Sequence, residues 1–429
     1  MKLKSIAFAA AALCAGQAHA LTPAVMNDAG TLKVYVSGAS ALSGAIGGLF
    51  TQNCQPATRD DYTLTGNLTF GRIYTCTLNA VNDFGLGAVN VMFQKRDAGG
   101  SGQGVGPLAN NTPIAFIEPT SCTIVPGPPA VKECASQSNR IPDGGVSDLE
   151  PNIFKAAVNG NFVLGGGATS VPINQTVFGL AVTQALYTAL QADQGTAGQP
   201  TVPQAVVGQM LRSGFPADPV AWSLLLPNTN NGTEDSQVTI CRRVNGSGTQ
   251  AAANRFFLEY PANSMLPSVA GDSTAPGHGT TPFTLLVVAN SAAADVVNCM
   301  TAAQTAGGFA MGHLSLENPE TASYRYVKIG GQTPSRDEAK AGRYPYFFES
   351  TGQTRTGAAA NVKSFLTSFF AGAGKPDNLA QLSAPVQQGV MANPNVCPDP
   401  FGGGTANEIT FCSRVTRNGN SLEFPSFFR

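Results

Sequence analysis

Charge is scarce in this chain. Only 12% of its 429 residues are Asp, Glu, Lys or Arg, about half the share that is usual in soluble proteins. The 25 basic and 26 acidic residues nearly cancel. A chain without a basic excess lacks the field that draws proteins to nucleic acids and to anionic membranes. We therefore expect no nucleic-acid partner.

Metal ligands are equally few. Beyond residue 20 the chain has two histidines, His278 and His313, and no Cys-x-x-Cys pair, whereas structural zinc sites use Cys and His at such short spacings. The composition thus predicts neither a metal nor another cofactor. No apolar run beyond the first twenty residues reaches the ~20 residues of a membrane-spanning helix, so we expect no stable membrane insertion.

Catalytic motifs are missing as well. A nucleophile elbow requires Gly-x-Ser-x-Gly, and neither Ser101 in GGSGQ nor Ser247 in NGSGT fits that pattern. The segment GVGPLA (104–109) imitates a dinucleotide fingerprint, but Pro107 would interrupt the start of its helix. His278 would need a nucleophile brought to it by the fold, and His313 is as consistent with a structural residue as with a ligand neighbour. We predict that the protein is not an enzyme.

The first twenty residues are typical of a signal peptide. MKLKSIAFAAAALCAGQAHA has two lysines, an apolar stretch from Ile6 to Gly16, and the small-x-small cleavage pattern Ala18-His19-Ala20. We expect cleavage before Leu21 and a periplasmic or secreted protein.

Removing the signal peptide leaves eight cysteines, an even number that argues for disulfides in an exported chain. Composition alone does not fix their pairing. We expect sequential pairing, since three of the resulting loops would be short: Cys54 with Cys76, Cys122 with Cys134, Cys241 with Cys299, and Cys397 with Cys412.

Strand-then-helix units recur along the chain. In LKVYVSGAS the apolar residues Leu32, Val34 and Val36 alternate, and Leu42 and Ile46 then follow at the helical interval. A second unit has an apolar strand over 283–288, a cap at Asn290 or Ser291, and a helix that carries Val296 and Met300. Such units predict an open α/β sheet. Four segments have the composition of loops: 51–80, 118–146, 226–236 and 263–282.

Three segments place small and hydroxyl residues at a turn before an expected helix: SGASALSG (37–44), AGGSGQGVG (98–106) and RVNGSGTQ (243–250). Backbone N–H groups at a helix start bind anions, and glycine lets the ligand approach them. Each segment alone is better explained by an ordinary Gly-Ser turn or a serine cap. All three together, with the pair Arg242-Arg243, favour an anion site.

The same segments resemble the periplasmic phosphate-binding proteins that feed ABC transporters. The likeness runs in order through VYVSGASAL, VNVMFQKRDAGGSGQGV, DGGVSDLEP, PQAVVGQMLRSGFPADPVAW with Trp222, CRRVNGSGTQAAANRFFL, GGFAMGHL, and YVKIGGQTPSRDEAKAGRYPYFFES with Gly342, Tyr344 and Pro345. The Arg-x-x-Gly-Ser-Gly-Thr segment and the Gly-x-Tyr-Pro segment are the most specific parts.

The resemblance implies a two-lobed α/β fold of the periplasmic-binding-protein type II class, with a ligand cleft between lobes joined by crossing strands. Lobe I would combine residues 21–172 with 310–429, including an extension at its end, and lobe II would span 173–309. Hinge closure over the ligand is the motion that such a fold implies.

The resemblance also assigns roles in an anion site. Arg243 would hold the anion, and Ser247, Gly248 and Thr249 would complete one wall. Arg242 would face outward or support the hinge.

Residues from the first half of the chain would form the opposite wall. Ser101 and Gly102 would donate hydrogen bonds, and Asp148 would accept one from protonated phosphate, unless it only caps a helix with Ser147. Where the family has threonine and an apolar residue, this chain has Ala41 and Leu42, so Ser40 or backbone N–H groups would donate there.

The implied function is that of an exported phosphate-binding protein, the solute-binding component for phosphate uptake through an ABC permease. An alternative is a secreted protein of the same fold that scavenges or senses an oxyanion, or has a structural or adhesive role, without a transporter partner.

Overall fold

The computed structural model describes residues 21–125, 131–212, 225–228, 237–263, 266–267, 284–398 and 404–428. The expected signal peptide, Trp222 and His278 lie outside these ranges. Within them, no helix has the length and apolar character needed to cross a membrane.

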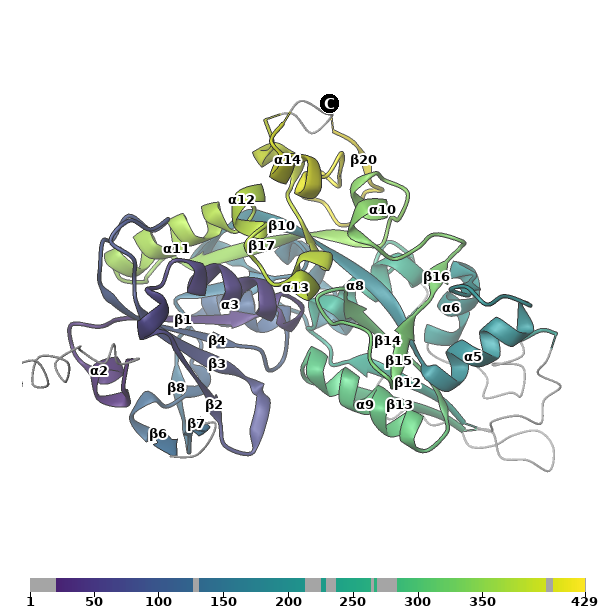
Figure 1. Ribbon diagram of the computed structural model, residues 1–429, viewed down its shortest axis with the longest axis horizontal. Helices are drawn as coiled ribbons and strands as arrows, with labels where there is room; N and C mark the ends of the chain where they lie inside the picture. Colours follow the sequence, from purple (N-terminus) through teal and green to yellow (C-terminus); the bar gives the residue numbers. More distant parts are fainter. Residues whose placement is uncertain are drawn as a thin grey trace, which may run out of the picture.

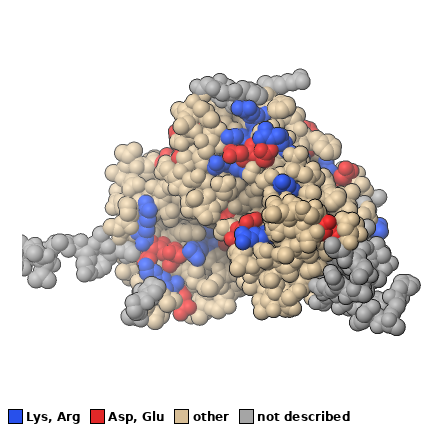
Figure 2. All heavy atoms as spheres, turned by 45° about the vertical axis from the view of Figure 1, so that its right-hand side comes forward, with Lys and Arg blue, Asp and Glu red and all other residues tan. Residues whose placement is uncertain are grey.

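The molecule consists of two α/β lobes that share one continuous sheet (Figure 1). Its main path runs β13-β12-β14-β10-β17-β9-β1-β4-β3-β2-β7-β6. On the face shown in Figure 2, uncharged residues cover most of the surface and charged residues gather in a few small groups, as expected from the composition.

The first lobe is built on β1 (Leu32–Gly38), which lies between β4 (Asn90–Arg96) and β9 (Gly144–Ser147) and is parallel to both. Helices α3 (Ser43–Gln52) and α11 (Ala360–Gly372) pack on this sheet. Aromatic rings fill the space between, with the rings of Phe50 and Phe93 stacked 5.0 Å apart. Burial of these large apolar side chains stabilises the lobe.

The second lobe repeats the arrangement. Strand β12 (Gln237–Arg243) lies between β13 (Thr284–Asn290) and β14 (Phe309–Ser315) and is parallel to both. Helix α8 (Gly248–Leu258) follows β12, and α9 (Ala293–Thr305) follows β13. The predicted helix residues Val296 and Met300 are fully buried. The expected cap at Asn290 or Ser291 is wrong, because α9 starts after Ala292.

Two long antiparallel strands join the lobes. The first part of β10 (Ala168–Thr183) pairs with β17 (Phe347–Arg355), and its second part pairs with β14. The pairing of β10 with β17 has a register shift between Pro172 and Gln175. The predicted boundaries at 172 and 309 therefore fall within β10 and at the first residue of β14. They remain a proposal for dividing the chain.

Two segments expected to be loops contain sheet strands. Residues 51–80 form the hairpin β2 (Asp60–Leu64) and β3 (Asn67–Thr77), and residues 118–146 contain β6 (Cys122–Val125), β7 (Val131–Cys134) and β8 (Gln137–Arg140). The hairpin extends the first lobe's sheet beyond β4. Its buried Tyr62 and Ile73 alternate with exposed polar residues, a strand pattern that the many Thr, Asn and Gly residues concealed.

The remaining described helices and strands are short. They are α2 (Pro23–Asn27), α4 (Gly106–Asn110), α5 (Gln184–Asp193), α6 (Gln204–Leu211), α10 (Arg336–Lys340), α12 (Pro376–Leu379), α13 (Ala384–Gln388), α14 (Ala406–Phe411), β5 (Ile114–Ile117), β11 (Thr201–Val202), β15 (Tyr324–Tyr326), β16 (Lys328–Ile329), β18 (Val390–Met391), β19 (Val415–Thr416) and β20 (Ser426–Phe427).

Four disulfides follow the sequential pairing: Cys54–Cys76, Cys122–Cys134, Cys241–Cys299 and Cys397–Cys412. The third joins β12 to α9 beneath the end of β12 at which the arginine pair lies.

A segment near the end of the chain, residues 413–428, touches both lobes, and we call it the C-terminal strap. Glu349 on β17 accepts hydrogen bonds from the backbone N–H groups of Arg417 (2.8 Å) and Gly419 (2.6 Å). Arg255 on α8 donates to the carbonyls of Ser421 (3.0 Å) and Leu422 (2.7 Å). The strap thus links the crossing strand to a second-lobe helix.

Candidate functional site

The three Gly-Ser segments meet where strands of both lobes end. The first continues from β1 into a short 3-10 helix (Ser40–Leu42), the second follows β4, and the third follows β12 with Ser247 as the N-cap of α8. The N–H of Gly102 donates to the carbonyl of Gly246 at 2.7 Å. In open α/β sheets, ligands bind outside such carboxyl ends of the strands.

Arg243 lies at the centre of this junction and is only 1% exposed. Its Nη1 donates to Ser40 Oγ at 2.7 Å, its Nη2 to the carbonyl of Ser291 at 2.7 Å, and its Nε to the carbonyl of Asn290 at 3.1 Å. Burial lowers the pKa of the guanidinium to about 10, so it is still charged at neutral pH. A buried cation therefore faces the first lobe with a neutral hydroxyl as its partner there.

Asp148 is the matching buried acid and is also 1% exposed. Its Oδ2 accepts from Thr249 Oγ1 at 3.4 Å, and its backbone N–H donates to Ser101 Oγ at 3.1 Å. Its Oδ1 has no hydrogen-bond partner within the described residues. Burial raises the pKa of the carboxyl to about 6, against the opposing effect of Arg243.

The alternative of a helix cap for Asp148 is wrong. The 3-10 helix that follows (Pro151–Lys155) has Glu150 in the cap position, two residues beyond Asp148. Ser147 instead bonds locally, with its Oγ donating to the carbonyl of Leu149 at 2.6 Å. The carboxylate of Asp148 is thus turned toward the second lobe.

The wall formed by α8 lies directly against the first lobe. A Cβ atom at Gly248 would collide with Ser101 Oγ and Asp148 Oδ2, so this position requires glycine. Ser247 and Thr249 are both buried, and Ser247 Oγ accepts from the N–H of Gln250 at 3.4 Å. The predicted residues on both walls therefore contact one another.

The first loop departs from what the resemblance implies. Ala41 and Leu42 are buried in different hydrophobic clusters, so their side chains serve packing. Ser40 Oγ accepts from Arg243 and also from the N–H of Ala293 at 3.1 Å, and thus caps α9 of the other lobe. The N–H groups of Gly44 and Ala45 donate to Glu317 (3.2 and 3.1 Å).

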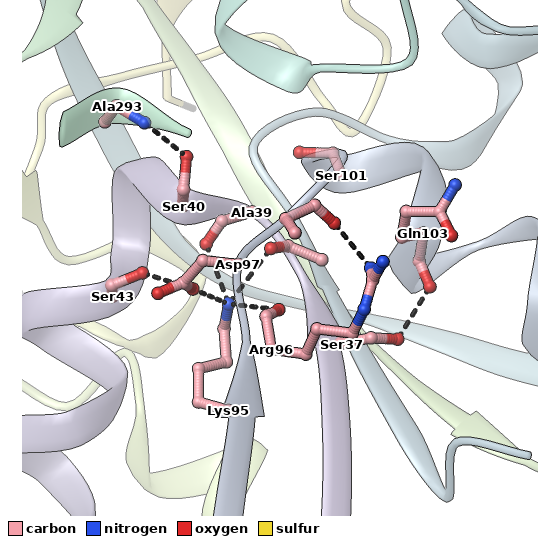
Figure 3. Close-up of polar contacts among 12 residues, drawn as sticks. Ser37, Ala39, Ser40, Ser43, Lys95, Arg96, Asp97, Ser101, Gln103 and Ala293 are labelled. Carbon is pink, nitrogen blue, oxygen red and sulfur yellow. Dashed lines mark hydrogen bonds and ion pairs between the residues drawn. The ribbon is translucent and has the colours of Figure 1, made fainter. Parts of the chain in front are cut away.

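Lys95, which the sequence reasoning missed, joins the first two loops (Figure 3). It is 1% exposed, and its Nζ donates to the carbonyls of Gly38 (3.0 Å) and Ala39 (3.1 Å) and to Asp97 Oδ1 (2.5 Å). Ser43 Oγ donates to the same carboxylate oxygen at 2.5 Å. The sequence does contain a signal for this role: a lysine lies within the apolar strand VMFQKR, just before a Gly-Ser loop. Because lysine is rarely buried without a partner, such a position indicates a polar contact nearby.

Arg242 was expected to face outward or to support the hinge. It does not face outward, because its side chain is buried and only 3% exposed. Its Nη2 donates to Asn245 Oδ1 at 2.6 Å and its Nε to the carbonyl of Arg243 at 2.9 Å. Helices α8 and α9 pack against β12, and the side chain of Arg242 at its end is buried. Arg242 therefore supports the loop between β12 and α8.

His313 on β14 belongs to the core. Its Nδ1 lies 3.3 Å from the hydroxyl of Tyr346, and its ring packs 5.2 Å from that of Phe257. Burial lowers its pKa to about 3, so the ring is neutral. This environment identifies a structural residue.

A cleft of about 260 Å³ opens between the lobes beside Ser40, and we call it the interlobe cleft. Its walls come from both lobes and from the segment after β14, and they comprise Ser40, Ser43, Gly44, Leu68, Thr69, Asp97, Ala292, Ala293, Ala294, Glu317, Asn318 and Val386. No group of three or more potential metal-ligating side chains occurs in the described part of the chain.

Neither a protein-family model nor a curated protein matches the sequence. Among solved structures, the chain is similar to a protein assigned as the substrate-binding protein of a phosphate ABC transporter, with bound phosphate, from Clostridium perfringens (TM-score 0.45, 12% identity, 83% of this chain and 99% of that chain). It is also similar to an ABC-type phosphate transport receptor from Vibrio cholerae (0.41, 12%, 79% and 93%) and to PstS from Borrelia burgdorferi (0.35, 10%, 82% and 97%). Because these likenesses are weak, the ligand has to be inferred from the chain's own side chains.

Proposed function

We propose that the protein binds phosphate, or a similar oxyanion, at the junction of its two lobes. The observation that carries the proposal is the buried guanidinium of Arg243, with Asp148 and the hydroxyls of Ser40, Ser101 and Thr249 arranged around it. Charge-assisted hydrogen bonds from arginine are among the strongest available to an oxyanion. In a chain with only 12% charged residues, this cation is buried where the two lobes meet.

Asp148 favours phosphate over sulfate. A carboxylate beside a bound anion is repulsive unless that anion brings a proton to share. Phosphate carries a proton near neutral pH and sulfate does not. The free Oδ1 of Asp148 would accept that proton.

Binding would exchange contacts between the lobes for contacts with the anion. The bonds of Ser40 to Arg243 and of Thr249 to Asp148 close the site directly, so an anion enters only when the lobes separate. Strands β10 and β17, which connect the lobes, would bend as the hinge. An anion then replaces Ser40 as the acceptor and closes the site again.

The proposal includes a role as the exported solute-binding component for phosphate uptake through an ABC permease, without catalysis. Four disulfides support an oxidising, extracytoplasmic compartment.

A second candidate is a scavenging, sensing or structural role without a transporter. The C-terminal strap favours it, because its bonds to Arg255 and Glu349 restrain the separation of the lobes on which delivery to a permease depends. Small-angle scattering with and without phosphate distinguishes the two: a transport component changes its radius of gyration on binding, and a strapped binder does not.

Calorimetry tests the binding proposal. The mature protein, stripped of phosphate by unfolding and refolding, is titrated with phosphate, sulfate, molybdate and buffer alone. Sub-micromolar binding of phosphate, lost in Arg243→Ala, supports the proposal. Absence of heat with every anion overturns it.

A further inference from the structure

The interlobe cleft provides room beside the anion site for more than an inorganic ion. We propose that the ligand is a phosphate monoester of a small neutral polyol, with its phosphoryl group at Arg243 and its polyol in the cleft. This inference rests on the proposed function and specifies its ligand class.

Ser40 connects the two regions. Its side chain lines the interlobe cleft, and its Oγ is bonded to Nη1 of Arg243 at 2.7 Å. Ala293, whose N–H donates to the same oxygen, also lines the cleft. A substituent on a phosphoryl group held by Arg243 therefore leads past Ser40 into the cleft.

The size of the cleft suits a short organic group. Its volume of about 260 Å³ lies just below the ~300 Å³ at which pockets for drug-sized ligands begin. Both lobes and the segment after β14 line the cleft. A ligand in the cleft would therefore contact all three. A bare anion at Arg243 would leave this space to water.

The lining chemistry selects hydroxyl groups. Asp97, Glu317 and Asn318 present oxygen acceptors, and Ser43 adds a hydroxyl. Leu68, Val386 and the alanines at 292–294 supply apolar surface against carbon atoms. Such a mixture of a few polar groups on an apolar lining is typical of sites for small organic ligands.

The charge of the cleft lining disfavours a ligand that carries a second acidic group besides its phosphoryl group. It contains two acidic residues, Asp97 and Glu317, and neither Lys nor Arg. A carboxylate or a second phosphoryl group on the ligand would face Asp97 and meet no cation of the lining in a partly desolvated space, whereas Glu317, whose raised pKa keeps it protonated near neutral pH, adds no charge. The cleft thus favours an uncharged polyol.

A variant of one cleft residue tests the assignment. Ala294 lines the cleft, is exposed, and lies in the first turn of α9, so Ala294→Trp fills the cleft without entering the core. Ala302→Trp, at an exposed position of the same helix outside the cleft, is the matched control. Calorimetry uses inorganic phosphate, glycerol 3-phosphate, 3-phosphoglycerate and glycerol on both variants and on the wild type.

At about pH 5.5, where a phosphate monoester still carries the proton that Asp148 would accept, we expect the wild type to prefer glycerol 3-phosphate over inorganic phosphate and 3-phosphoglycerate by at least about tenfold. Ala294→Trp should lose this preference while its affinity for inorganic phosphate stays within about twofold, and Ala302→Trp should behave like the wild type. If inorganic phosphate binds more tightly than the ester, or if Ala294→Trp leaves the preference unchanged, the polyol assignment is wrong and the anion site stands. If no phosphate compound binds, the proposed function itself fails.

Discussion

Ser40 Oγ lies 2.7 Å from Nη1 of Arg243 and, at the same time, 3.1 Å from the backbone nitrogen of Ala293. One hydroxyl of the first lobe thus accepts hydrogen bonds from both a buried guanidinium and a helix N-terminus of the second lobe. A neutral hydroxyl is a weaker acceptor for a cation than an anionic oxygen. An oxyanion bound as proposed would therefore give Arg243 a stronger acceptor than Ser40 provides.

Replacing Arg243 should severely weaken anion binding and leave the protein folded. Arg243→Ala removes a charge-assisted contact worth about 1.5–3 kcal/mol, so phosphate affinity should fall by about tenfold to more than a hundredfold. Arg242→Ala is the matched control. Because the side chain of Arg242 donates to Asn245 and to the carbonyl of Arg243, contacts that support the loop, its loss should lower the melting temperature more than the affinity. Titration calorimetry and thermal unfolding of both variants measure this, and equal losses of affinity would place the site elsewhere.

Asp148→Asn should narrow the selectivity between phosphate and sulfate. The amide donates a hydrogen bond where the carboxylate could only accept, so sulfate should gain affinity while phosphate loses some. The wild type should prefer phosphate by at least about a hundredfold. Competition calorimetry on both proteins gives the two ratios. An unchanged ratio in the variant would remove Asp148 from the site.

Glu317 should make stability depend on alkaline pH. Burial raises the pKa of its carboxyl to about 8, so the folded state holds a proton that the unfolded state releases at its ordinary pKa of 4.5. This contribution is complete below pH 4.5 and is lost as the pH rises through about 8. Glu317→Gln stays uncharged, so its melting temperature relative to that of the wild type should rise between pH 5 and pH 9.

A difference of 1 kcal/mol corresponds to about 2–4 °C in domains of this size, so we expect a relative gain of at least about 2 °C at the alkaline end. Glu133→Gln, at a partly exposed position of β7, should show no such trend. Parallel curves for Glu317→Gln and the wild type across the pH range would show that the carboxyl is not held protonated.

Loss of one disulfide should destabilise the first lobe without changing ligand binding. Removing Cys122–Cys134 by a double substitution to Ala should cost about 2–4 kcal/mol in the free energy of unfolding, because the open chain gains entropy when unfolded. Urea unfolding of the variant and the wild type measures the change. Non-reducing peptide mapping of the wild type must first find the pair; free thiols at these positions would refute it.

The features that the sequence predicted correctly are local elements of secondary structure. The alternation of Val34 and Val36 before a Gly-Ser turn is visible within ten residues, and the turn lies at the end of a buried strand as expected. The same holds for Arg243 before Ser247. Strand ends and helix starts are determined by neighbouring residues, so short patterns reveal them.

The parts that the sequence missed depend on distant partners. Glu317 meets Gly44 across 273 positions, and Ser40 meets Arg243 across 203. No local pattern shows that a carboxylate occupies the helix start that was expected to hold the ligand. Lys95 was overlooked for the same reason, because its role is evident only once the two loops it joins are adjacent.

The four disulfides all lie within a lobe or within the region near the end of the chain, and none of them bridges β12 or α8 to the first-lobe strands. The disulfides therefore stiffen each half of the molecule, while in the described residues hydrogen bonds, packing and the attraction between Arg243 and Asp148 hold the halves together. A reducing environment would therefore destabilise each half separately, whereas an anion at the proposed site would act on the contacts between the halves. The cross-links thus resist unfolding of each half and leave the relative position of the halves to non-covalent contacts.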